Sequence, residues 1–231
     1  MLSDSQRRSF DDDGYLVVPR VFHVDELAWL GGEMRSVVHS HAAPFASAWS
    51  SDEAPAGSFI DLHLRQEAFR RLAVHPRLRA LAAGLAGQPV RLLRTRLFPG
   101  ARSGDPIWRR DAEIWRRTRL HDGANAITAV VVLDGHYAER PAFHVLPGSH
   151  RDDAAGQPIH LEAALGSVIL LHCATRYALR QPGNAARPAF LVTYDAVPAL
   201  EAEPARGQNA APPPPAAADA SLWPVPIWIA G

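Results

Sequence analysis

Residues 127–134 read ITAVVVLD, and residues 145–151 read VLPGSHR. The first stretch is a continuous, valine-rich apolar run, which is typical of a strand buried on both faces. The second continues a short alternating strand from Phe143 and stops at Pro147 and Gly148, a pair that ends strands in turns. Buried strands that end in turn signals predict that the second half of the chain is a β-sheet structure.

The predicted secondary structure changes from helices to strands after Gly87. Ser3 and Gln6 have the spacing of a capping box and predict a helix to about residue 12. Helices first and then spaced short strands predict an α+β fold whose second part is a barrel or a double-sheet sandwich. We predict helices over residues 3–12, 24–39, 66–75 and 77–85, strands over 15–18, 90–98, 127–133, 143–146, 168–171 and 190–194, and a loop over 43–57.

The chain of 231 residues divides by composition into one domain and a tail. Residues 1–200 form the predicted domain, which is long enough to bury a core. Residues 201–221 are dominated by alanine and proline and predict a stiff linker. Residues 222–231 are apolar and contain Trp223 and Trp228. We expect this tail to dock on the domain or on a neighbouring subunit, as a homodimer or with a paralogue, because exposed tryptophans form a sticky patch.

The charge pattern excludes several classes of partner. The net charge is zero, so we expect neither nucleic acid nor an anionic membrane as a partner.

All 24 basic residues are arginine, which is typical of a GC-rich bacterial genome. A single cysteine, Cys173, fits a reducing compartment. With neither a secretory signal nor an apolar run of about 20 residues, we predict a cytoplasmic protein.

Several motifs, taken together, resemble the phytanoyl-CoA dioxygenase family of iron(II)- and 2-oxoglutarate-dependent oxygenases. They are FDDDGYLVVP at 10–19, WRRD at 108–111, the two stretches quoted first, and GSVILLH at 166–172, which resembles the strand leading to the second metal histidine. Family members usually carry Trp-His-Gln-Asp where this chain has WRRD. The resemblance runs in order from about residue 5 to residue 195. It implies a double-stranded β-helix (a jelly roll) with N-terminal helices packed on it.

The resemblance also implies a metal site of two histidines and one carboxylate, from which this chain departs. Asp111 keeps the carboxylate, but Arg109 stands at the first histidine position and Tyr177 at the distal one. Arginine has no lone pair to donate and repels a cation, and a neutral phenol is a poor ferrous ligand. We therefore predict no metal ligands and no cofactor.

The co-substrate site implied by the resemblance is altered as well. A serine two residues after the distal histidine is replaced by Leu179, and the later arginine matches Arg187 after one deletion. The usual Asn-Gly before the Pro-Gly-Ser-His turn is replaced by Arg140 and Pro141. Arg187 is thus a candidate for binding 2-oxoglutarate, as a vestige, or the anion of a substrate.

The remaining polar residues allow two interpretations each. Arg109 and Asp111 either form a salt bridge that fills the metal site or an acid–base and anion-binding pair. Tyr177 either donates a proton or simply packs. Arg94 and Arg96 alternate along one strand and share a face, which points either into a pocket or to solvent.

Histidines offer replacement ligands. His121 and His172 could be recruited to a metal, or could be a loop residue and a strand residue of no catalytic importance. His172 and Trp108 are also candidates for lining a substrate pocket. His150 belongs to the Pro-Gly-Ser-His turn, where the resemblance implies a structural role, and Cys173 is expected to be a small buried filler.

Three functional hypotheses follow. The first is a metal-independent enzyme that performs a redox-neutral step on a small, possibly anionic or polar molecule in bacterial specialised metabolism. In it Asp111 is the base, Tyr177 the acid, and Arg109 or Arg187 the anion holder. The second is a non-catalytic partner subunit of an active oxygenase. The third is an iron/2-oxoglutarate hydroxylase with recruited ligands.

Overall fold

The computed structural model describes residues 2–40, 59–98, 108–113, 125–133, 143–152, 156–179 and 189–197. The predicted loop over 43–57, the linker and the tail lie outside these ranges, so the predicted division of the chain stays a prediction. Within the described ranges, no helix is both long and apolar enough to cross a membrane.

Helices and strands follow the predicted order. The elements are α1 (Asp4–Asp13), β1 (Tyr15–Val18), α2 (Val24–Ser40), β2 (Phe59–Ile60), the 3-10 helix η1 (Leu62–Leu64), α3 (Glu67–Ala73), α4 (Pro76–Ala86), β3 (Val90–Phe98), β4 (Ile127–Val131), β5 (Phe143–Val145), β6 (Ile159–Leu161), β7 (Val168–His172), β8 (Tyr177–Leu179) and β9 (Ala189–Ala196). The elements that the sequence did not predict, β2, η1, β6 and β8, have at most three residues each. Such short segments carry too few residues to show a period.

Local signals explain the ends of the first helix. The Ser3 side chain accepts a hydrogen bond from the Gln6 backbone, and the Gln6 side chain accepts one from the Ser3 backbone, which completes the predicted capping box. At the other end Gly14 adopts the left-handed conformation and its N–H donates to the carbonyl of Phe10. Pro76 opens α4 at its first turn, where a missing N–H costs nothing.

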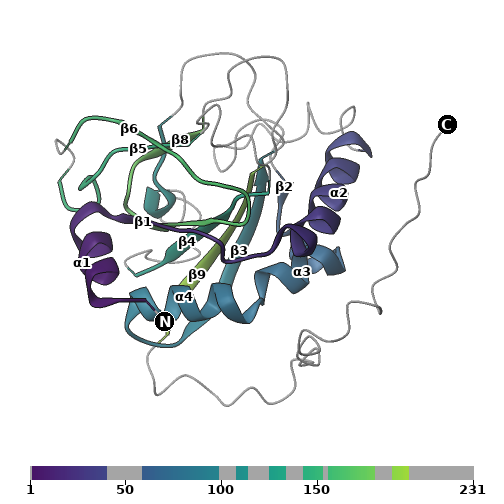
Figure 1. Ribbon diagram of the computed structural model, residues 1–231, viewed down its shortest axis with the longest axis horizontal. Helices are drawn as coiled ribbons and strands as arrows, with labels where there is room; N and C mark the ends of the chain where they lie inside the picture. Colours follow the sequence, from purple (N-terminus) through teal and green to yellow (C-terminus); the bar gives the residue numbers. More distant parts are fainter. Residues whose placement is uncertain are drawn as a thin grey trace.

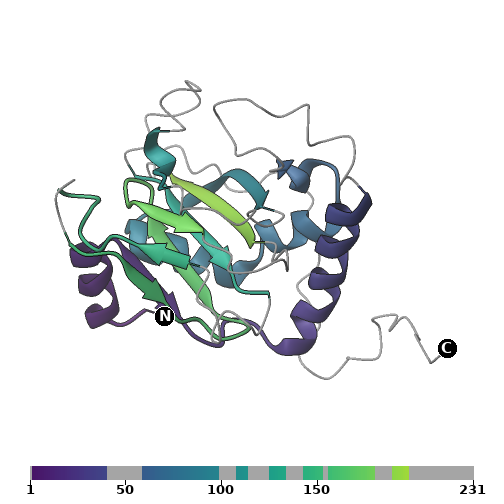
Figure 2. The ribbon, with the colours of Figure 1, turned by 90° about the horizontal axis from the view of Figure 1, so that it is seen from above.

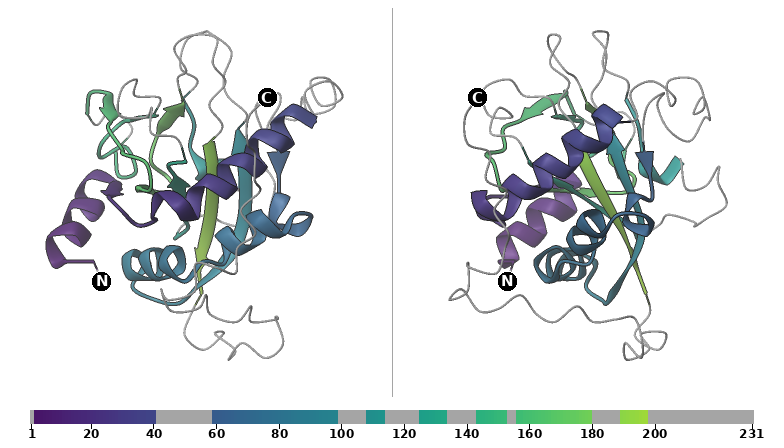
Figure 3. Two further views of the ribbon diagram at one scale, coloured as in Figure 1. Left: turned by 45° about the vertical axis from the view of Figure 1, so that its right-hand side comes forward. Right: turned by 90° about the vertical axis from the view of Figure 1, so that its right-hand side faces the viewer.

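The strands form two antiparallel sheets. The larger has the order β1-β7-β4-β9-β3-β2, and the smaller has the order β6-β5-β8. Helices α2, α3 and α4 lie along one side of the larger sheet, whereas the smaller sheet lies on its other side (Figures 1 and 3). Figure 2 shows the same layers from above. The predicted α+β class is confirmed.

Alternation along the central strands divides the core in two. On β7, Val168 and Leu170 pack with the helices, whereas Ile169 and Leu171 pack toward the smaller sheet. The first cluster is the larger and contains the apolar faces of the helices. The second fills the space between the sheets, which is the interior of the barrel and ends at Tyr177 on β8.

The N-terminal segment is hydrogen-bonded to the turn between β7 and β8 and to the turn that follows β5. Thr175 donates a hydrogen bond from its hydroxyl to the carbonyl of Gly14 at 2.7 Å, and a ring nitrogen of His150 lies 3.0 Å from the carbonyl of Asp11. Arg151 donates to the carbonyl of Asp12 at 2.6 Å. These contacts join two of the motifs that carry the family resemblance, and they give His150 the predicted structural role.

Replacing Gly14 with alanine tests this junction. Gly14 has φ of 78°, and a Cβ there would lie 2.4 Å from side-chain atoms of both His150 and Thr175. We expect Gly14→Ala to lower the free energy of unfolding by roughly 2–5 kcal/mol, since backbone strain and overpacking both contribute. Urea unfolding measures the loss.

Gly87→Ala is the matched control. Gly87 has φ of 68°, but nothing lies within 4 Å of its added Cβ, so only the backbone strain of about 1–2 kcal/mol remains. Equal losses in the two variants would show that the contact with His150 and Thr175 is unimportant.

Candidate functional site

Arg109 and Tyr177 are held together by their backbones. They form an isolated antiparallel bridge, in which the Arg109 N–H donates to the Tyr177 carbonyl at 2.9 Å and the Tyr177 N–H donates to the Arg109 carbonyl at 3.0 Å. Residues directly opposite in an antiparallel pair place their side chains on the same face. Tyr177 points into the barrel interior, where its ring stacks on Phe143 at a centroid separation of 5.4 Å. Arg109 is therefore on the interior face as well.

Asp111 collects hydrogen bonds from three elements. The Tyr177 hydroxyl donates to Oδ1 at 2.7 Å, while Arg96 of β3 and Thr128 of β4 both donate to Oδ2 at 2.5 Å. We call Arg96, Asp111, Thr128 and Tyr177 the Asp111 cluster. All four are buried, with at most 2% of each residue exposed. Thr193 of β9 extends the cluster, since its hydroxyl lies 3.0 Å from that of Thr128.

The charges of the cluster follow from its burial. Burial lowers the pKa of Arg96, but the adjacent Asp111 carboxylate raises it further, so the net pKa is above that of a free arginine. Burial raises the pKa of Tyr177 well above its usual value, which keeps the phenol protonated. Burial, assisted by the repulsion of Arg96, lowers the pKa of Arg109, although a guanidinium stays charged at physiological pH.

This arrangement gives each side chain a defined chemical ability. A carboxylate that accepts hydrogen bonds from three donors is held in a fixed orientation. The phenol is a neutral hydrogen-bond donor, and Arg109, which is half-buried, brings a second positive charge beside it. Two guanidinium groups thus lie around one carboxylate.

The observed partner of Asp111 differs from the one we considered. We weighed a pair between Arg109 and Asp111, whereas the ion pair seen here joins Asp111 to Arg96. Arg96 comes from β3, 15 residues earlier in the chain. A pairing between distant strands depends on sheet register, which the spacing of Arg109 and Asp111 could not reveal.

Arg94 and Arg96 lie on the same face of β3, as their alternation predicts. In the register with β9, Arg94 is opposite Thr193 and Arg96 is opposite Leu191, and Leu191 belongs to the interior cluster. Only Arg96 ion-pairs with Asp111; Arg94 pairs with Asp61 at 3.4 Å.

His172 lies away from the Asp111 cluster, and its assignment to a substrate pocket stays a prediction. Its ring lies 6.5 Å from that of Phe10 and 5.2 Å from that of His150, on the face of β7 opposite to Leu171. Its Nδ1 accepts a hydrogen bond from the backbone of Ala174 at 3.2 Å. Successive residues of a strand face opposite sides, so His172 points away from the barrel interior.

Other candidates have simpler positions. Cys173 is buried with Ala112 and Ala126, and burial raises the pKa of its thiol to about 11, as expected of a filler. Trp108 is half-buried beside Arg109. Arg187 and His121 lie outside the described residues, so their proposed roles stay predictions.

Thr128 and Thr193 are site residues that we did not predict. Thr128 is the one hydroxyl residue in the segment ITAVV of β4. Thr193 directly follows the apolar residues FLV of β9. A buried polar side chain needs a partner, so such an interruption was a usable signal.

Comparison with known proteins identifies the family that the chain matches. The family model for phytanoyl-CoA dioxygenase (PhyH) matches residues 10–178. Ectoine dioxygenase from Sphingopyxis alaskensis is 29% identical over 157 residues, which cover 65% of this chain and 50% of that protein. The ectoine dioxygenase of Streptomyces avermitilis is 24% identical over 148 residues. The chain spans about half the length of the curated relatives it matches.

Solved structures show the same fold. The non-heme α-ketoglutarate-dependent epimerase SnoN from nogalamycin biosynthesis has a TM-score of 0.67 and 26% identity, with 84% of this chain and 82% of that one covered. EctD from S. alaskensis with 2-oxoglutarate and 5-hydroxyectoine has a TM-score of 0.69 and 25% identity, with 85% and 77% covered. The two antiparallel sheets are therefore the predicted jelly roll.

These structures correct the prediction that no cofactor takes part. The similar proteins are described as α-ketoglutarate dependent, or with 2-oxoglutarate or iron bound. The prediction of a cofactor-free site is contradicted by them. The prediction was based on positions 109 and 177 alone. The absence of histidine at these two positions does not determine whether other residues of the chain can bind a cofactor.

The described residues nevertheless do not fit a ferrous ion beside Asp111. Both oxygens of Asp111 already accept hydrogen bonds, and the Arg96 guanidinium would repel a second cation. Within the described ranges, no group of three His, Cys, Asp or Glu side chains could hold a metal ion. The described residues thus do not supply the ligands that iron needs.

Replacing Arg96 with methionine tests the ion pair. We expect Arg96→Met to lower the free energy of unfolding by about 3–5 kcal/mol, because it leaves Asp111 buried without its counter-charge. In the double variant Arg96→Met/Asp111→Asn the loss should be smaller than the sum of the single losses. Urea unfolding of the four proteins gives the coupling energy; additive losses would rule the pairing out.

The half-buried His172 predicts a pH dependence of stability. Burial is the main cause that lowers the pKa of His172 to about 4, whereas an unfolded chain takes up the proton near 6.5. The neutral ring therefore contributes stability that is complete above pH 6.5 and is lost as the pH falls toward 4, by roughly 2–3 kcal/mol.

A His172→Asn variant keeps an acceptor for the Ala174 N–H and removes the titrating group. As the pH falls from 6.5 to 4, the free energy of unfolding of this variant should decrease less than that of the natural protein. His23→Asn, at an exposed position, controls for the loss of one histidine. An unchanged slope in His172→Asn would contradict the assignment.

Proposed function

Because this chain belongs to the phytanoyl-CoA dioxygenase family, we propose that it is an enzyme that transforms a small molecule beside the Asp111 cluster. The proposed step is redox-neutral, such as an isomerisation, cyclisation, elimination or hydration, within bacterial specialised metabolism. Arg109, Asp111 and Tyr177 are the proposed catalytic residues.

One observation carries the proposal, namely the hydrogen bond between the Tyr177 hydroxyl and Asp111 Oδ1. In the family resemblance, positions 109, 111 and 177 are those of the three metal ligands. In this chain they are adjacent through the Arg109–Tyr177 bridge and the Tyr177–Asp111 bond. The position of the reactive centre is thus retained while its side chains have changed.

The two oxygens of Asp111 accept hydrogen bonds from different donors. Arg96 and Thr128 occupy Oδ2, whereas Oδ1 accepts from Tyr177 alone among the hydrogen bonds described here. If a substrate oxygen takes the place of Oδ1 as acceptor of the Tyr177 proton, Oδ1 becomes able to accept a proton. Asp111 is then the base, and the neutral phenol stabilises the developing oxyanion.

Such a step needs no net change of oxidation state. A proton leaves a substrate carbon for Asp111 Oδ1, its electron pair moves to the oxygen held by Tyr177, and the proton returns to the same or another carbon. Arg96 and Thr128 touch Asp111 and not the substrate, so they are positioning residues.

Tyr177→Phe tests the proposal. The variant keeps the ring that stacks on Phe143 but removes the donor, and we expect turnover to fall by about 100-fold or more. Extract of the source bacterium, incubated with protein and compared by mass spectrometry, should yield a product of unchanged mass or one that differs by a water.

Tyr194→Phe is the matched control. Tyr194 is also fully buried and donates one hydrogen bond, but its acceptor is the carbonyl of Ala73 on the helical side of the sheet. It should lose about 1 kcal/mol of stability and keep its turnover. Equal turnover of the Tyr177→Phe variant and the natural protein would refute the assignment of Tyr177.

The comparisons favour a second candidate, an iron- and 2-oxoglutarate-dependent oxygenase like the similar proteins. Its ligands would include residues outside the described ranges, of which His121 is a candidate. The same mass comparison separates the two functions. A product heavier by one oxygen atom, formed with consumption of 2-oxoglutarate and with stoichiometric bound iron, would establish the oxygenase and exclude the redox-neutral step.

A further inference from the structure

We propose that the apolar segment 222–229 of the tail docks in a groove beside α4 of the same chain. The groove has a volume of about 810 Å³ and lies between the start of α1, the turn from β1 to α2, helix α4 and the turn from α4 to β3. This interaction surface is separate from the Asp111 cluster and does not depend on the reaction proposed there. The lining of the groove, its charge and the path of the chain each support the docking.

The floor of the groove is an uncovered edge of the larger apolar core. Four of its lining side chains are only partly buried and pack against that core, namely Leu2, Val18, Val21 and Leu81. Apolar groups that remove such a surface from water lower the free energy of the chain. Segment 222–229 reads LWPVPIWI and supplies two tryptophans and several aliphatic side chains. Its prolines favour an extended chain, which is a shape that fits a groove.

The rim of the groove is positively charged. Its basic lining residues are Arg7, Arg20, His23 and Arg77, whereas no acidic residue is among the described residues that line it. Glu26 offsets one of these charges, because its carboxylate pairs with Arg77 at 3.0 Å. Arg7 donates a hydrogen bond to the carbonyl of Gly84, which fixes the guanidinium at the groove and leaves its charge in place. The rim therefore attracts a negatively charged segment of chain.

The segment that leads to the tail has the complementary charge. Residues 198–221 contain Glu201, Glu203 and Asp219 against the single basic residue Arg206. Arg20, an exposed residue of the rim, has a φ of 54°, in the left-handed region that favours glycine. The fold thus holds this arginine at the groove against backbone strain.

The chain reaches the groove directly after β9. The Val197 N–H donates to the carbonyl of Pro89 at 2.9 Å, and Pro89 follows Gly87 and Gln88, which line the groove. A proline-rich chain of the length of 198–221 can span up to about 70 Å. The 11 residues of α4 span about 17 Å, so the tail can reach every part of the groove. Because the tail is tethered beside its site, its effective concentration there exceeds that of a second copy.

Cross-linking of the full chain tests the proposal. The pair Ala80→Cys/Ser221→Cys places one thiol in the groove and one next to the tail, while the natural Cys173 is buried. We expect a short bis-maleimide to join the two new thiols about 10-fold or more faster than in a control pair. Mass spectrometry and a denaturing gel should show a product with the mass of one chain.

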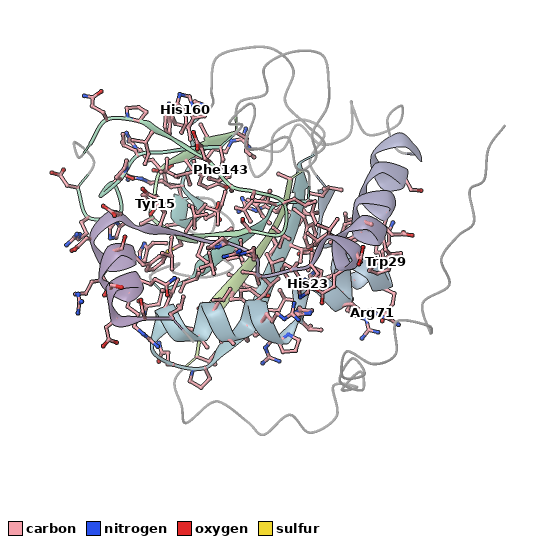
Figure 4. The ribbon with its side chains drawn as sticks, in the orientation of Figure 1. Tyr15, His23, Trp29, Arg71, Phe143 and His160 are labelled. Carbon is pink, nitrogen blue, oxygen red and sulfur yellow. The ribbon has the colours of Figure 1, made fainter. Side chains whose placement is uncertain are left out.

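Gln157→Cys/Ser221→Cys is the matched control. It keeps the same thiol next to the tail, and Gln157 is exposed just before β6 of the smaller sheet. Figure 4 shows His23, which lines the groove, far from His160 on β6. Equal rates in the two pairs would overturn the proposal. A main product with the mass of two chains would also overturn it, because the tail would then occupy the groove of a second copy.

Two variants of the groove pair test the apolar and the charged contacts. Trp223→Ala/Trp228→Ala should reduce the cross-linking rate to that of the control pair, and an unchanged rate would refute the docking of this segment. Arg20→Glu should slow the reaction by about 2- to 5-fold at low salt. Arg65→Glu makes the same change of charge at an exposed residue outside the groove and should have no effect. Circular dichroism checks that each variant is folded.

Discussion

The ion pair between Arg96 and Asp111 is the constraint on which the interior of this protein depends. It joins β3 of the larger sheet to the segment that pairs with β8 of the smaller sheet, so it connects the two sheets at one end of the barrel. Because both groups are buried, neither can exist there without the other. Thr128 and Tyr177 complete the shell of donors, and the position of every proposed catalytic group follows from this shell.

The same pair sets the charge balance at the position where the family resemblance implies a metal site. A carboxylate beside a metal is balanced by the charge of the metal. Here the guanidinium of Arg96 supplies positive charge to Asp111 from within the chain, and a protonated phenol stands where the resemblance implies a histidine. The similar proteins are described as α-ketoglutarate dependent, or with 2-oxoglutarate or iron bound. The described residues of this chain do not include a group of ligands for such an ion. The fold is shared with these proteins.

Much of the architecture was predictable because it depends on patterns among residues that are close in sequence. The capping box of Ser3 and Gln6 and the apolar run of β4 each depend on neighbours in sequence, and each was found where predicted. The short strands β6 and β8 were missed, since three residues show no period. The surroundings of His172 could not be predicted for a related reason: the face to which its ring points depends on the register of β7, which places it with Phe10 and His150.

By itself the sequence determined the family, the α+β class, the order of the main elements and the identity of the residues at positions 109, 111 and 177. It did so because helix caps, alternation and motif order are properties of contiguous residues. Only the tertiary structure decided that Arg96, rather than Arg109, pairs with Asp111, that Thr128 and Thr193 join the cluster, and that His172 lies beside Phe10 and His150. These contacts join residues from different strands, and the register that aligns them is set by the packing of the whole sheet.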